Sequence, residues 1–70
     1  MMEKTIAIEI REHALSAIRA LVEVLNVCRD GCSPEEFQQI KRGVGLSIGR
    51  IETELLAVVY AAYPELDDLK

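Results

Sequence analysis

The stretch Asp30-Gly31-Cys32-Ser33-Pro34-Glu35-Glu36, near the middle of this 70-residue chain, separates two long segments with helical apolar patterns. Gly31 has the position of a glycine that ends a helix in the left-handed conformation. Ser33 is followed by Pro34 and, three residues on, by Glu36, which is the pattern of an N-cap serine with a capping box. Because only about two or three residues then join the helices, the second must run antiparallel to the first. The stretch therefore predicts an all-α helical hairpin.

The first helix is expected over about residues 3–29. Polar side chains recur every three or four positions and mark one continuous face: Thr5, Glu9, Glu12, Ser16, Arg19, Glu23, Asn26 and Asp30. The alternation of Ile6, Ile8 and Ile10 leaves a short strand over 4–10 as an alternative.

The apolar side chains of this helix form two rows. The first row is Ile10, Ala14, Ala17, Leu21, Val24 and Cys28, and the second is Leu15, Ile18, Val22 and Leu25. One antiparallel neighbour covers only about a third of a helix's circumference, so the second row predicts a further partner.

The second helix is expected over about residues 34–63, where Tyr63 precedes Pro64, and an acidic tail follows over 64–70. A row with alternating spacings of three and four is predicted to face the first helix: Phe37, Ile40, Val44, Ile48, Ile51, Leu55, Val58 and Ala62. Arg50 and Glu54, one turn apart, are expected to form a surface ion pair.

Three glycines, Gly43, Gly45 and Gly49, fall inside this helix, although each costs about 1 kcal/mol relative to alanine there. We interpret them as a surface for close packing against a second copy. The alternatives are a kink around 43–45 and a groove that receives a partner helix. Beyond Glu54 the helix is apolar on nearly all sides, which also predicts an interface. The predicted interface residues are Gly45, Gly49, Leu55, Leu56, Val59, Tyr60 and Tyr63.

Residues 1–70 form one small domain, below the size at which a single core reliably stabilises a fold by itself. The two helices match in length. We therefore expect two hairpins to pair into a homodimeric four-helix bundle, with a tetramer as the alternative.

The charge and the apolar runs limit the other partners. A formal net charge of -4 makes nucleic acid an unlikely main partner. The most apolar run, 55–63, is far shorter than the ~20 residues that span a bilayer, so no membrane segment is predicted. The N-terminus lacks a signal-peptide pattern, and a cytoplasmic location is expected.

Few residues are candidates for chemistry. In the cytoplasm, Cys28 and Cys32 are expected to be small buried thiols, with a disulfide or a metal site as alternatives. His13 is interpreted as structural or solvated, since no nucleophile or orienting acid is recognisable around it. The pairs Glu9 with Glu12 and Glu52 with Glu54 are interpreted as solvated surface. No catalytic, cofactor-binding or metal-binding residue is predicted, and the chain is not expected to be an enzyme.

The sequence therefore predicts a non-enzymatic protein that acts through protein–protein association, as an adaptor, regulator or structural piece. In size and hairpin layout the chain resembles small helical chaperones of bacterial secretion systems. This resemblance implies, as an alternative, an assembly chaperone whose apolar faces a different helical protein covers. A further alternative is an RNA-binding bundle that uses the basic cluster Arg29, Lys41 and Arg42.

Overall fold

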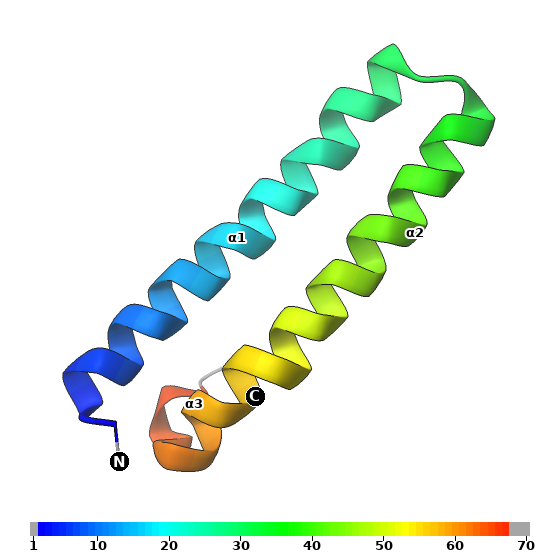
Figure 1. The fold of residues 1–70 in the computed structure, drawn as a ribbon. Helices are drawn as coiled ribbons and strands as arrows, with labels where there is room; N and C mark the ends of the chain where they lie inside the picture. The colour runs from blue at the N-terminus through cyan, green and yellow to red at the C-terminus, as the bar shows by residue number, and fades with distance from the viewer. Residues whose placement is uncertain (1, 68–70) are drawn as a thin grey trace.

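The computed structural model describes residues 2–67, which form two long antiparallel arms (Figure 1). The first arm is α1 (Lys4–Gly31). The second arm consists of α2 (Pro34–Ile51), a π-helical turn (Glu52–Leu56) and α3 (Ala57–Ala62), and a 3₁₀ turn (Pro64–Leu66) follows. No strand occurs among residues 2–67, so the all-α prediction is confirmed. The alternative of a strand over 4–10 is wrong, because the helical periodicity of α1 runs unbroken through those residues.

The turn between the arms is built on the predicted capping box. The Ser33 Oγ accepts a hydrogen bond from the Glu36 N–H at 3.2 Å, and the Glu36 Oε1 accepts one from the Ser33 N–H at 2.9 Å. These two bonds satisfy donors that the first turn of α2 would otherwise leave free.

The left-handed conformation predicted for Gly31 is wrong. Gly31 is the last residue of α1, and no glycine in the described part of the chain has a positive φ. The chain leaves the helix through Cys32, which is extended with φ −118° and ψ 157° and donates its N–H to the Cys28 carbonyl. Ser33 is extended as well, as a residue before proline prefers. Two successive extended residues make the turn without a left-handed position.

The two arms meet along one face of each helix. On α1 the inward residues alternate in spacings of four and three and are buried or half-buried: Ala7, Arg11, Ala14, Ile18, Leu21, Leu25 and Cys28. On α2 the buried or half-buried residues of the predicted row are Phe37, Val44, Ile48 and Ile51. Small side chains such as Ala7 and Ala14 keep this core thin.

Beyond Ile51 the predicted row is wrong by one position. Leu55 and Val58 are 48% and 54% exposed, whereas Leu56 and Val59 are 4% and 1% exposed. The cause is the π-helical turn, in which the Ala57 N–H donates to the Glu52 carbonyl five residues back. This turn holds one residue more than an α-helical turn, so every later residue is displaced by one position around the helix.

The change in helix type lies after the glycines. Residues Gly43 to Gly49 all belong to the continuous α-helix α2, so the local break that the sequence suggested around 43–45 occurs instead at Glu52–Leu56. The Thr53 hydroxyl donates to the Gly49 carbonyl at 3.0 Å, and Arg50 and Glu54 form the predicted ion pair at 2.9 Å. Both contacts span the start of the π-helical turn.

The open end of the hairpin, opposite the turn, is tied together by its termini. The Tyr63 hydroxyl donates to the Met2 carbonyl at 3.1 Å, and Lys4 Nζ lies 3.2 Å from Glu65 Oε2. The pKa of the Glu65 carboxyl is lowered below its usual 4.5. The larger cause is a backbone hydrogen bond at Glu65, and the smaller is the hydrogen bond from Lys4. Because this pKa is lowered on folding, the ion pair stabilises the folded hairpin at neutral pH. This stabilisation is lost as the pH falls through the lowered pKa. Leu69, which the sequence places in the tail, lies outside the described residues.

Deletion of one residue distinguishes the π-helical turn from the rest of the arm. Removing Thr53 lets the turn become α-helical while Leu56 and Val59 stay inward, so the free energy of unfolding should change by less than about 1 kcal/mol. Removing Ser47, another exposed hydroxyl residue, turns Ile48 and Ile51 away from α1 and brings Glu52 inward, which should cost more than about 3 kcal/mol. Urea unfolding followed by circular dichroism measures both. Equal losses in the two variants would contradict this role of the π-helical turn.

The two tyrosines near the open end should respond differently to loss of their hydroxyls. The buried Tyr60 hydroxyl has no hydrogen-bond partner within residues 2–67, whereas the Tyr63 hydroxyl bonds to Met2. Tyr60→Phe should leave stability unchanged or raise it by about 1 kcal/mol, and Tyr63→Phe should lower it by about 1 kcal/mol. Thermal unfolding of both variants at equal concentration tests this, and a larger loss for Tyr60→Phe would be inconsistent with the structure.

Candidate functional site

Two open apolar hollows lie on one side of the hairpin, one near each end. The hollow near the turn has a volume of about 420 Å³ and is lined by Glu23, Val24, Val27, Cys28, Cys32 and Ile40. The hollow near the open end has a volume of about 400 Å³ and is lined by Ile6, Glu9, Ile10, His13, Ala14, Ala17 and Leu55.

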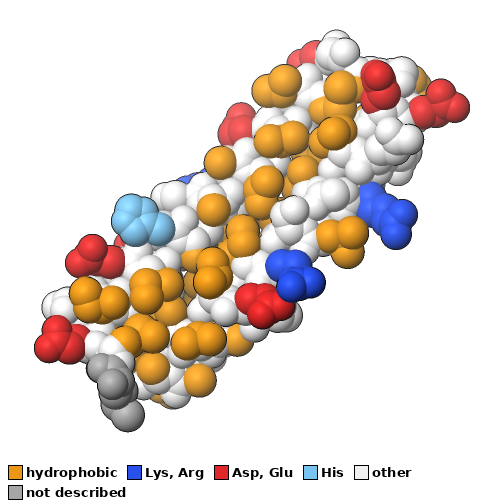
Figure 2. Space-filling view, viewed as in Figure 1, with side chains coloured by type: hydrophobic (Ala, Val, Ile, Leu, Met, Phe, Trp, Pro, Cys, Tyr) orange, Lys and Arg blue, Asp and Glu red, His pale blue; other side chains and the backbone are white. Residues whose placement is uncertain are grey.

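Both hollows belong to the same face. Ala17 in one hollow and Val24 in the other are seven residues apart, or about two helical turns, so they point to the same side of α1. Figure 2 shows hydrophobic side chains in a band along the first arm and between the two arms, gathered most densely at the open end. We call this surface the hollowed face and define it by the apolar residues Ile6, Ile10, Ala17, Val24, Val27, Ile40 and Leu55.

The π-helical turn contributes directly to this face. Displacement by one position turns Leu55 out of the core, where it joins Ile6 and Ile10 of α1 at the open-end hollow. The same displacement buries Leu56 and Val59 against α1 within one chain. The π-helical turn thus determines which residues end the core and which residue of the second arm lines the open-end hollow.

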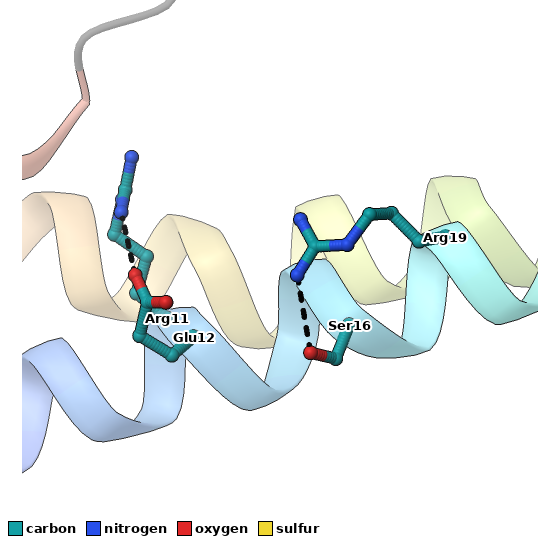
Figure 3. Close-up of polar contacts among 4 residues, drawn as sticks. All are labelled: Arg11, Glu12, Ser16 and Arg19. Atoms are coloured by element: carbon teal, nitrogen blue, oxygen red, sulfur yellow. Dashed lines mark hydrogen bonds and ion pairs between the residues drawn. The ribbon is translucent and has the colours of Figure 1, made fainter.

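Few polar side chains line the two hollows. Several basic side chains elsewhere form hydrogen bonds or ion pairs with residues that are close in the sequence. On α1, Arg11 contacts Glu12 and Arg19 donates to Ser16, both at 3.2 Å (Figure 3). Arg29, a member of the predicted basic cluster, donates to Asn26 at 3.2 Å. Within the open-end hollow the polar side chains are Glu9 and the exposed His13.

The predicted interface residues occupy different environments. Leu55 lies on the hollowed face, and Leu56 and Val59 lie in the core of the single chain. Tyr60 and Tyr63 are half-buried, with Tyr63 bonded to Met2. The pattern that could have located the hollowed face is a second row spaced by threes and fours, one position before the inward row of α1: Ile6, Ile10, His13, Ala17, Ala20, Val24 and Val27. Ile40, predicted to face α1, instead lines the hollow near the turn.

Gly45 and Gly49 face open space. A Cβ atom built on either glycine would meet no heavy atom within 4 Å, so no close backbone contact within the single chain requires them. Gly45 comes five residues after Ile40, which is about 140° around the helix, so it lies away from the hollowed face. Close packing against a second copy at these glycines stays a prediction.

Cys28 and Cys32 form a disulfide, with their Cα atoms 5.0 Å apart. The expectation that both are thiols is therefore wrong. The bond joins residues one helical turn apart, Cys28 in the last turn of α1 and Cys32 just after it, and both line the hollow near the turn. A spacing of four residues at a helix end brings the two side chains to the same side, which is the geometric condition that the bond needs.

Within residues 2–67, no group of three or more His, Cys, Asp and Glu side chains is arranged to hold a metal ion. The same residues include no helix with the length and apolar character that crossing a membrane requires. Comparison with protein-family models, with curated proteins and with solved structures finds no match for this chain.

Reduction of the disulfide should have a small effect on stability. The bond closes a loop of only about five residues. For this length the chain-entropy relation gives a stabilisation of at most about 2 kcal/mol. Urea unfolding with and without a phosphine reductant measures the difference. The double variant Cys28→Ala with Cys32→Ala is the control and should not respond to the reductant. Unfolding of the wild type on reduction alone would show that the bond holds more of the fold than its local position implies.

Proposed function

We propose that this protein acts without enzymatic chemistry, by pairing with a second copy of itself through the hollowed face to form a four-helix bundle. The observation that carries this proposal is the amount of exposed surface. The chain exposes 5217 Å². A compact monomer of 7.8 kDa is expected to expose about 4,400 Å². The excess, about 800 Å², matches the area that one partner contributes to a standard protein–protein interface.

The shape of the chain supports the same proposal. Its radius of gyration is 14.6 Å, whereas a compact domain of 70 residues has a value of about 11 Å. An elongated hairpin of this kind can bury only one side of each arm by itself. A second hairpin placed on the hollowed face would give each helix two neighbours, which is the arrangement of a four-helix bundle.

The apolar residues of the hollowed face also favour association. Val27 is 74% exposed, the highest value among the large apolar side chains of residues 2–67, and it lies beside Val24 and Ile40 at one hollow. Contiguous exposed apolar patches mark interaction sites in soluble proteins. In such a bundle the protein would serve as an adaptor, a regulator or a structural piece.

The cellular location bears on this proposal only through the disulfide. A cytoplasmic location stays a prediction from the sequence, and the Cys28–Cys32 bond weighs against it, because disulfides are rare in reducing compartments. The proposed bundle does not depend on the cellular compartment.

A matched pair of valines tests the proposed interface. Val24 and Val22 are on the same helix and are 41% and 43% exposed, but Val24 lines a hollow and Val22 does not. Val24→Arg should weaken self-association at least about tenfold, because it places a charge without a partner in the interface, and Val22→Arg should leave it within about twofold.

Sedimentation velocity over a range of concentrations gives both dissociation constants, and circular dichroism confirms that both variants are helical. Dissociation by Val22→Arg alone would move the interface to the opposite side of the hairpin. A wild type that is monomeric throughout would overturn self-association and direct attention to the chaperone alternative, in which a different protein covers the face.

A further inference from the structure

We propose that the second copy lies antiparallel on the hollowed face, so that the turn of each hairpin covers the open end of the other. The two-fold axis passes between Ala17 and Ala20 of α1, perpendicular to the long axis of the hairpin. This inference rests on the proposed function, since it specifies how the two copies meet.

The first argument is the symmetry of the residue pattern on α1. The row of this helix that lines the hollowed face has a spacing that is symmetric about the point between Ala17 and Ala20, the two smallest residues of the row, with His13 and Val24 equally distant from it and Ile10 and Val27 equally distant further out. In an antiparallel contact between two copies of α1, each residue meets its symmetry mate. The alanines meet each other at the axis, and Ile10 meets Val27 of the second copy.

The second argument is the distribution of side-chain size. The hydrogen bond between Tyr63 and Met2 aligns the two arms, and this alignment places Ser47 of α2 between the levels of the two alanines and Gly43 about two residues, or ~3 Å, beyond Ala20 toward the turn. Gly43 and Ser47 lie three and seven residues after Ile40, and so on its side of the helix. The middle of the hollowed face therefore carries only small side chains, and the two hollows of similar volume lie on either side of it. An axis through the middle lets the backbones approach and exchanges one hollow for the other.

The third argument is charge. The half of the hairpin near the turn, residues 19–46, balances Arg19, Arg29, Lys41 and Arg42 against Glu23, Asp30, Glu35 and Glu36. In the described half near the open end, Lys4, Arg11 and Arg50 are outnumbered by Glu3, Glu9, Glu12, Glu52, Glu54, Glu65 and Asp67.

An axis along the hairpin would place these two acidic halves together, with Glu52 and Glu54 at the level of Glu9 and Glu12 of the second copy. The perpendicular axis instead places each acidic half beside the charge-balanced half of the second copy. Like charges brought together in a complex disfavour an orientation, so the charge distribution favours the perpendicular axis.

The area is sufficient for a stable pair. The chain has principal extents of 46, 21 and 16 Å, so overlap of two copies along the full length covers between roughly 700 and 1,000 Å² of each, a range that includes the ~800 Å² per partner of a standard interface. The antiparallel arrangement gives full overlap because the axis lies at the middle of the arms.

Distances between spin labels in the dimer test the orientation. The labels are attached to p-acetylphenylalanine introduced at Asp30, near the turn, or at Thr5, near the open end, so that the disulfide is left intact. Both positions are exposed. At 1.5 Å per residue, antiparallel copies should give distances of at least about 35 Å between two Asp30 labels and about 40 Å between two Thr5 labels. Mixed dimers with one label of each kind should give a short distance, below about 30 Å.

Two other outcomes would contradict the proposal. Short distances in the two single-site dimers, with a long one in the mixed dimer, would overturn the antiparallel orientation and leave self-association standing. Absence of any dipolar coupling, together with a monomeric mass of the labelled protein, would overturn self-association itself. Circular dichroism of each labelled protein verifies that the hairpin is folded.

Discussion

Two helices that pack only on each other can bury no more than one face of each, and the structure of this chain follows from that constraint. The inward residues form a thin core, in which α1 contributes two small side chains, Ala7 and Ala14, in its first half and larger aliphatic side chains in its second half. Each flank of that core carries further apolar residues that the single chain leaves exposed, such as Val22 on one side and Val24 on the other. The stability of a chain this short depends on what covers those flanks. The proposed second copy would cover the flank that carries the hollowed face.

The π-helical turn connects the core with the surface. An uninterrupted α-helix would have placed Leu55 and Val58 in the core and would have left Leu56 and Val59 outside. The additional residue in the turn reverses these roles, so that Leu56 and Val59 close the core next to the Tyr63–Met2 contact, while Leu55 joins the open-end hollow. Such turns occur often at functional sites, because they re-aim side chains without breaking a helix. Here the re-aimed side chain contributes to a surface that is suited to protein association.

Much of the fold could be predicted from local chemistry, because the decisive signals act over a few residues. Ser33, Pro34 and Glu36 specify the start of α2, and the unbroken polar face of α1 excludes a strand. The π-helical turn could not be predicted, because its sequence fits an α-helix equally well and tertiary packing decides between them. The same displacement moves Leu55, which the sequence placed both in the row facing the first helix and among the interface residues, out of the core and onto the hollowed face. Gly31 does not adopt the expected left-handed conformation, because Cys32 and Ser33, both extended, provide the exit from α1 that a left-handed glycine would have given. The disulfide depends on redox conditions, which the spacing of Cys28 and Cys32 does not encode.

The central claim is that a second copy covers the surface that one hairpin leaves exposed. Sedimentation equilibrium of the wild-type protein over a hundredfold range of concentration tests this claim most directly, because it measures molar mass without assumptions about shape. The account predicts a mass of about twice 7.8 kDa at the upper end of the range, with dissociation on dilution that follows a single monomer–dimer equilibrium. A folded, helical protein whose mass stays at 7.8 kDa throughout would contradict the account, and the exposed apolar flanks would then belong to a different partner.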